Sequence, residues 1–138
     1  MTQAKLVRDV MTRDVVTLRG DDRLVSADDI MRLGRIRHMP IVDREQRLLG
    51  ILSQTDLFRG AVLDALGYDP KATRRISSGI AVSEIMTTPV VTIAPDAPLQ
   101  DAARLLLERK IGCLVVLEHE RIVGILTESD FVKLCAGA

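Results

Sequence analysis

Two near-identical phrases, GILSQTDLF and GILTESDFV, each place a hydroxyl side chain three residues before an aspartate. Ser53 precedes Asp56 in the first phrase, and Thr127 precedes Asp130 in the second. One interpretation is a helix capping box, in which hydroxyl and carboxylate satisfy each other's backbone N–H groups. The other is a ligand site, because a carboxylate accepts ribose hydroxyls and a helix N-terminus favours a phosphate. The two interpretations are compatible, and the residues alone leave both open.

These phrases belong to an internal repeat. VMTRDVVTL returns as IMTTPVVTI, and the offset between their methionines is 86 − 11 = 75 residues. Between Gly50 and Gly124 the offset falls to 124 − 50 = 74, so the second copy lacks one residue between Glu118 and Arg121. A hairpin loop tolerates such a change. The repeat predicts two copies of one structural unit.

Each copy predicts the order β-α-β-β-α. A β-branched run, VVTL or VVTI, indicates the first strand, and Asp21 or Asp96 is the expected N-cap of the helix that follows. HMPIVD and CLVVLE predict buried strands, each joined through a polar loop to a second strand. Ser53 or Thr127 then begins the last helix. The first helix has an apolar stripe at helical spacing, formed by Leu24, Ala27 and Met31 in one copy and by Leu99, Ala102, Ala103 and Leu106 in the other.

Composition limits the classes of function. A chain of 138 residues with 47% apolar and 28% charged residues predicts one compact globular domain rather than a disordered protein. Nineteen basic and nineteen acidic residues cancel, so no strong field favours nucleic acid or an anionic membrane. Apolar runs such as residues 111–117 are too short to span a bilayer, which takes roughly 20 residues, and no signal segment is evident. We therefore expect a cytoplasmic location and no membrane contact.

Enzyme signatures and metal-ligand spacings are not evident in the sequence. No nucleophile elbow, P-loop or dinucleotide fingerprint occurs, and His38 and His119 fall in different copies. Cys113 and Cys135 lack the paired spacing of a zinc or redox site, and we expect both to be buried or inert thiols. The sequence predicts no catalytic residue and no metal site.

The motifs MTxxVVT, RHMPIVD and G-apolar-apolar-Ser/Thr-x-x-Asp, in this order and largely repeated, closely resemble the CBS domain family. The resemblance runs from Val10 to about Leu134. It implies an α+β fold in which two tandem β-α-β-β-α repeats pack through their sheets with pseudo-two-fold symmetry, a pair called a Bateman module. The expected division is a first repeat at residues 1–67, a connector at 68–83 and a second repeat at 84–138.

Members of this family bind adenosine compounds, so the resemblance implies that the twin Ser/Thr and Asp residues contact a sugar and a phosphate. AMP, ADP, ATP or S-adenosylmethionine would act as a regulatory ligand, and no cofactor is expected. Further residues would line the base pocket or face the phosphates. The ligand-binding residues implied are Thr12, Val15, Val16, Arg37, His38, Met39, Pro40, Ser53 and Asp56 in the first copy, and Thr87, Val90, Val91, Gly112, Cys113, Thr127 and Asp130 in the second.

The two implied sites differ in charge. Arg37 and His38 precede MPIVD in the first copy, whereas Gly112 and Cys113 occupy the matching positions in the second. The resemblance therefore implies that the first site neutralises a phosphate better than the second. The alternative is a solvated arginine and a satisfied polar histidine. The arginine pair at residues 74–75 either adds charge to the site or is an exposed basic pair.

Apolar side chains raise the question of self-association. The sequence contains three aromatic residues, Phe58, Tyr68 and Phe131. We expect both phenylalanines to pack in the core. The consecutive leucines at 105–107 cover about 200° of a helix, more than one core-facing stripe needs. They favour a homodimer, and the alternative is that all three are buried within one chain.

We therefore interpret the chain as a dimeric regulatory module that senses an adenosyl ligand and signals to a separate, unidentified protein. The alternative is a structural module without a small-molecule ligand, acting through protein contacts alone.

Overall fold

The computed structural model describes residues 5–66 and 80–137, which form two compact units. Of these residues, the central unit comprises 16–66 and 80–89, and the terminal unit combines 5–15 with 90–137. Tyr68 and the arginine pair at residues 74–75 lie outside the described residues. No helix in the described part of the chain has the length and apolar character needed to cross a membrane.

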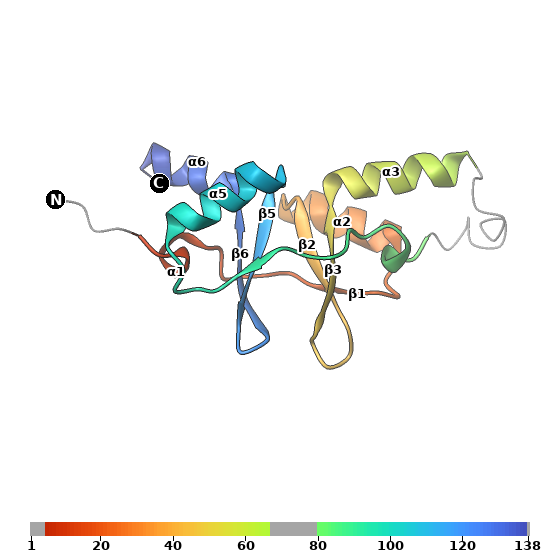
Figure 1. Cartoon of the computed structure of the whole chain (residues 1–138). Coiled ribbons are helices and arrows are strands. Elements are labelled where there is room, and N and C mark those ends of the chain that lie inside the picture. Colours follow the sequence, from red (N-terminus) through yellow and green to blue (C-terminus); the bar gives the residue numbers. More distant parts are fainter. Residues whose placement is uncertain (1–4, 67–79, 138) are drawn as a thin grey trace. The chain divides into compact units, whose positions relative to one another are not determined.

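The central unit is a three-stranded sheet with two long helices (Figure 1). Strand β1 pairs in parallel with β2, and β2 pairs antiparallel with β3. The β2–β3 hairpin points away from the helices (Figure 1). The elements are β1 (Leu18–Arg19), α2 (Leu24–Gly34), β2 (His38–Val42), β3 (Leu48–Ser53), α3 (Gln54–Ala65) and the 3₁₀ helix η1 (Val82–Glu84).

The terminal unit repeats this plan with a sheet in the order β4-β5-β6. The β5–β6 turn is short because His119 and Glu120 both have positive φ, as in a two-residue hairpin turn. The predicted α+β fold and the β-α-β-β-α order are confirmed in both copies. The elements are α1 (Val7–Val10), β4 (Thr92–Ile93), α5 (Leu99–Arg109), β5 (Cys113–Glu118), β6 (Arg121–Thr127) and α6 (Glu128–Ala136).

The first strand of each copy is shorter than its β-branched run predicts. Only two residues pair in each, from Leu18 in the first copy and from Thr92 in the second. Val15 and Val16 lie outside any strand, where the chain passes from the terminal to the central unit. The β-branched pattern marked the apolar character of these segments but not where their pairing starts.

The predicted N-caps Asp21 and Asp96 are wrong. The N-cap residues are Arg23 for α2 and Pro98 for α5, and neither makes a side-chain cap. The first helical N–H groups instead donate to backbone carbonyls of distant segments. The N–H of Leu24 donates to the Ile80 carbonyl at 2.7 Å, and the N–H of Leu99 donates to the Lys5 carbonyl at 2.9 Å. Backbone acceptors thus replace a side-chain cap.

Each unit has its own apolar core. The predicted stripe is buried on both α2 and α5, with Ala103 only half-buried. Phe131 packs against the core of the terminal unit, as expected. The same expectation is wrong for Phe58, which is 72% exposed because the neighbouring Leu57 occupies the core-facing position on α3.

The three leucines of α5 have different environments. Leu106 is buried, Leu105 is half-buried, and Leu107 is 78% exposed. The alternative that all three are buried within one chain is therefore wrong for Leu107. This residue leaves apolar surface on the terminal unit.

The segment before each copy packs on the other copy. The N–H and carbonyl of Thr12 bond to the carbonyl and N–H of Ile125 at 2.8 and 2.9 Å, and Thr87 pairs in the same way with Ile51 at 2.8 and 3.0 Å. The MT phrase of each copy thus lies along the last strand of the other. This exchange explains why the terminal unit contains both ends of the chain.

The glycine of each GIL phrase makes room for the exchanged segment. A Cβ atom on Gly124 would lie 2.5 Å from the Met11 sulfur and 3.0 Å from the Thr12 carbonyl oxygen. On Gly50 it would lie 2.6 Å from the Met86 sulfur and 3.1 Å from the Thr87 carbonyl oxygen. The glycine and the MT phrase are therefore two sides of one contact.

We expect Gly124→Ala to lower the free energy of unfolding by about 1 to 3 kcal/mol, the usual cost of overpacking. Gly34→Ala is the control, because a Cβ there meets only Ile36 at 3.6 Å and alanine favours a helix. Urea unfolding monitored by circular dichroism measures both. Equal stability of the two variants would contradict the close contact.

Candidate ligand-binding site

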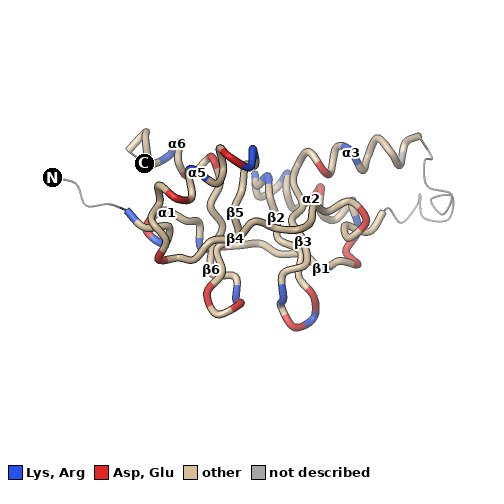
Figure 2. The backbone as a smooth tube through the Cα atoms, viewed as in Figure 1, with Lys and Arg blue, Asp and Glu red and all other residues tan. Residues whose placement is uncertain are grey.

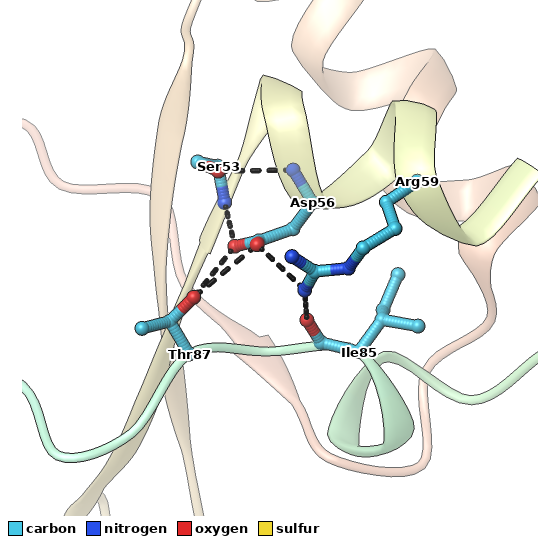
Figure 3. Close-up of polar contacts among 5 residues, drawn as sticks. All are labelled: Ser53, Asp56, Arg59, Ile85 and Thr87. Carbon is cyan, nitrogen blue, oxygen red and sulfur yellow. Dashed lines mark hydrogen bonds and ion pairs between the residues drawn. The ribbon is translucent and has the colours of Figure 1, made fainter.

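Ser53 and Asp56 form a closed capping box at the start of α3 (Figure 3). The Asp56 N–H donates to the Ser53 hydroxyl at 3.0 Å, and the Ser53 N–H donates to Asp56 Oδ2 at 2.9 Å. The capping interpretation is thus confirmed for the first copy. Asp56 is only 4% exposed, so its carboxylate depends on protein donors.

Two side chains outside the capping box also bond to the Asp56 carboxylate (Figure 3). The Thr87 hydroxyl donates to both oxygens at 3.2 Å. One terminal nitrogen of Arg59 donates to Oδ1 at 3.0 Å and to the Ile85 carbonyl at 3.2 Å. The carboxylate thus joins the helix start, the exchanged MT segment and a cation.

The terminal unit holds a matching group around Asp130, which is 6% exposed. The Thr127 N–H donates to Oδ2 at 2.9 Å, and the Thr12 hydroxyl donates to Oδ1 at 2.9 Å. The Thr127 hydroxyl lies 3.4 Å from Oδ2 and makes no cap to the helix backbone. Here only the carboxylate half of the capping box is closed.

The residues preceding β2 and β5 lie beside these helix starts. The Arg37 carbonyl accepts the Gln54 N–H at 2.8 Å, and the Gly112 carbonyl accepts the Glu128 N–H at 3.2 Å. Both contacts tie the start of a strand to the first turn of the following helix. The Arg37 side chain is exposed.

We call the two groups the central cradle and the terminal cradle. In strand register, His38 pairs with Ser53 and Cys113 pairs with Thr127, which places these side chains at the same sheet edge as the helix starts. The central cradle consists of Arg37, His38, Ser53, Asp56, Arg59 and Thr87, and the terminal cradle of Thr12, Gly112, Cys113, Thr127 and Asp130.

The remaining predicted site residues have other surroundings. Met39 and Pro40 are fully buried, and Met39 belongs to the central core. The valines of the two β-branched runs lie beyond the ends of the paired strands, and Val16 is the exposed one. They are Val15, Val16, Val90 and Val91.

The sequence interpretation missed two features of the cradles. One is the contact of Arg59 with Asp56, and the other is that Thr12 and Thr87 each bond to the aspartate of the other copy. Arg59 follows Asp56 by three residues, a spacing at which helical side chains meet, so local sequence contains a signal for this ion pair. The exchange has no local signal, because Thr12 bonds to a carboxylate 118 residues away. Only the tertiary structure brings Thr12 to Asp130.

The cradles are the main candidates for binding chemistry. No cluster of metal-ligating side chains occurs within the described ranges. Arg lies together with Asp or Glu at both hairpin tips, so neither tip carries charge of one sign (Figure 2). A charged ligand would therefore be bound by local contacts rather than by a broad field.

The two cysteines differ in chemistry. Burial and, to a smaller extent, the nearby Asp130 carboxylate together raise the pKa of the Cys113 thiol to about 12. Cys113 is thus a neutral thiol at physiological pH. Cys113 is buried, as one part of the expectation held, whereas Cys135 is exposed, so burial cannot make the Cys135 thiol inert.

We expect iodoacetamide at about pH 8 to modify Cys135 and not Cys113 in the folded protein, because only the thiolate reacts. Mass spectrometry should show one adduct per chain before unfolding and two after it. Cys135→Ser is the control and should show none before unfolding. Rapid labelling of Cys113 in that variant would contradict the burial.

Comparison with known proteins places the chain in a family. The CBS domain model matches residues 7–62 and 82–137. The chain is 36% identical to a crystal structure from Vibrio cholerae that carries a provisional acetoin-utilization assignment (AcuB), with a TM-score of 0.81 over 98% of this chain and 93% of that one.

Two further similar structures contain adenosyl compounds. The CBS domain pair of protein MJ0100, in complex with 5′-methylthioadenosine and S-adenosyl-L-methionine, is 26% identical with a TM-score of 0.82, and 98% of each chain is covered. CBSX2 in complex with AMP is also 26% identical, with a TM-score of 0.77 and 96% of each chain covered.

The chain spans 23% to 48% of the length of four curated relatives that it matches, some of which are named as enzymes.

Proposed function

Because this chain belongs to the CBS domain family, with two repeats in tandem, we propose that it is a regulatory module that binds an adenine nucleotide or adenosyl compound. The ligand occupies the central cradle, the terminal cradle or both. Its ribose hydroxyls bond to Asp56 or Asp130, and its phosphate lies at the adjoining helix start. We assign no reaction and no resident cofactor to the chain.

The observation that carries this proposal is a buried carboxylate at the start of a helix, present once in each unit. Asp56 and Asp130 are held by their own N-cap amides, so their oxygens are fixed in place before a ligand arrives. Fixed acceptors reduce the entropy cost of binding. Adenosyl compounds in the MJ0100 and CBSX2 complexes support the choice of ligand class.

The charges around the two cradles support the prediction that the two sites bind a phosphate unequally. Arg37 belongs to the central cradle and Arg59 is ion-paired with its carboxylate. In the terminal cradle Gly112 and the neutral thiol Cys113 replace Arg37 and His38, and Lys133, at the position of Arg59, makes no ion pair among the described residues. A phosphate is therefore better neutralised in the central cradle. Thr12, Val16, Val91 and the other predicted pocket residues remain candidates for contact with the base.

We expect Asp56→Asn to weaken AMP binding about 10- to 150-fold, because a charged hydrogen bond contributes roughly 1.5 to 3 kcal/mol. Isothermal titration calorimetry with AMP, ADP, ATP and S-adenosylmethionine measures the affinity of each variant for these compounds. Asp28→Asn is the control, because it removes the same charge from a half-exposed carboxylate on α2. Wild-type affinity in Asp56→Asn would reject Asp56 as a ribose ligand.

The second candidate function is a structural module that acts through protein contacts alone. It is favoured by the capping box of Ser53 and Asp56, which is closed without a ligand, and by exposed apolar side chains on the helices. An absence of heat with all four compounds would favour this alternative.

We also propose that a second copy of the chain covers the helices. In the central unit, α2 and α3 border a groove of about 510 Å³ lined by Val25, Phe58 and other residues. In the terminal unit, Leu107 and Val132 leave apolar surface on α5 and α6. A homodimer would bury this surface and carry ligand occupancy to a separate partner protein, and we expect this to occur in the cytoplasm.

We expect Phe58→Glu to shift the protein toward a monomer, because it places a charge in the apolar groove. Size-exclusion chromatography with light scattering measures the mass. Gln46→Glu is the control, because it adds the same charge in the β2–β3 loop, away from the helices. A monomeric wild-type protein, or an unchanged dimer in Phe58→Glu, would reject this interface.

A further inference from the structure

Arg59 holds a carboxylate that the proposed ligand needs. Its guanidinium donates to Asp56 Oδ1 at 3.0 Å from a side chain that is 56% exposed, whereas the Asp56 side chain is 5% exposed (Figure 3). The same nitrogen also donates to the Ile85 carbonyl, which fixes the guanidinium over the carboxylate. The arginine thus covers Asp56 from the solvent side.

The Asp56 carboxylate has little acceptor capacity left. It offers about four acceptor positions. The Ser53 N–H and Arg59 occupy one position each, and the Thr87 hydroxyl is shared between both oxygens. A ribose diol brings two donors, so at least one present donor must leave.

The three donors differ in how readily they leave. The Ser53 N–H is part of the backbone cap of α3, and Thr87 is fixed by two backbone bonds to Ile51. Arg59 has a half-exposed side chain and uses one nitrogen. A guanidinium that leaves the carboxylate retains its charge and its remaining donors, which match a phosphate.

In the terminal cradle, no arginine among the described residues bonds to the carboxylate. Lys133 occupies the position that corresponds to Arg59, at the offset of 74 residues. Within residues 5–66 and 80–137, neither Lys133 nor Asp130 takes part in an ion pair. Among the described residues, the donors to the Asp130 carboxylate are one main-chain N–H and two hydroxyl groups.

From this difference we infer that Arg59 determines specificity in the central cradle, by yielding Asp56 to a ribose only when a phosphate of the same ligand receives the guanidinium. This rests on the proposed function. The central cradle then selects nucleotides over nucleosides. The terminal cradle, whose Asp130 has no ion-paired cation among the described residues, discriminates less between nucleotides and nucleosides.

Site-resolved titration tests the inference. The amides of Ser53 and Thr127 each donate to the carboxylate of their own cradle, so their NMR resonances report the two cradles separately in the full chain. AMP and adenosine are the two probes. In the wild type we expect the Ser53 amide to report AMP binding at least about tenfold tighter than adenosine binding.

Arg59→Gln should reduce that preference by about tenfold or more, with weaker AMP binding and unchanged or tighter adenosine binding. Arg59→Lys should retain part of the preference for AMP over adenosine. Arg32→Gln is the matched control, because it removes the same charge from an exposed arginine of the central unit that pairs with Asp28 and Asp29. Thermal unfolding checks that every variant is folded.

The outcomes separate the two proposals. Equal losses for AMP and adenosine in Arg59→Gln, a preference equal to that of Arg32→Gln, or binding at the Thr127 amide alone would overturn the role of Arg59. The binding function would stand in each of these cases. If neither amide responds to either compound in the wild type, the proposed function fails and this inference fails with it.

Discussion

A buried aspartate that bonds to a threonine far away in sequence is the interaction on which both units depend. Asp56 accepts from Thr87, and Asp130 accepts from Thr12. Each carboxylate also accepts from its own N-cap amide, so one side chain joins a helix start to an exchanged segment. Because each carboxylate is nearly inaccessible to water, loss of these donors would leave a charge without solvation.

The same interaction explains the choice of residues in the repeated phrase. Glycine allows the MT backbone to approach the last strand, and the aspartate accepts the N-cap amide at each helix start. Aspartate also reaches the threonine of the exchanged segment. The capping and binding interpretations therefore concern one set of atoms, because the carboxylate that accepts the N-cap amide is also the one that the proposed ligand would use.

Near-identity of the repeats makes their differences informative. A neutral buried thiol stands at position 113, where the first copy has His38, and a lysine stands where the first copy has Arg59. These substitutions leave the fold of both units unchanged, but among the described residues only the Asp56 carboxylate is ion-paired. Equivalent geometry with unequal electrostatics is a basis for two sites with different ligand preferences.

The sequence by itself determined the repeat, the β-α-β-β-α order and the pairing of Ser53 with Asp56. All of these follow from local periodicity and from short-range spacing. Local spacing also contained the ion pair of Arg59 with Asp56, although its meaning required the count of donors on a buried carboxylate.

Only the tertiary structure decided which MT phrase serves which aspartate. Because the exchanged segments provide backbone acceptors at the starts of α2 and α5, the expected caps Asp21 and Asp96 were not used. The exposure of Phe58 and the pairing of Thr12 with Asp130 likewise depend on contacts between distant residues. Such contacts leave no trace in local composition, because either copy of a repeated sequence could supply the partner.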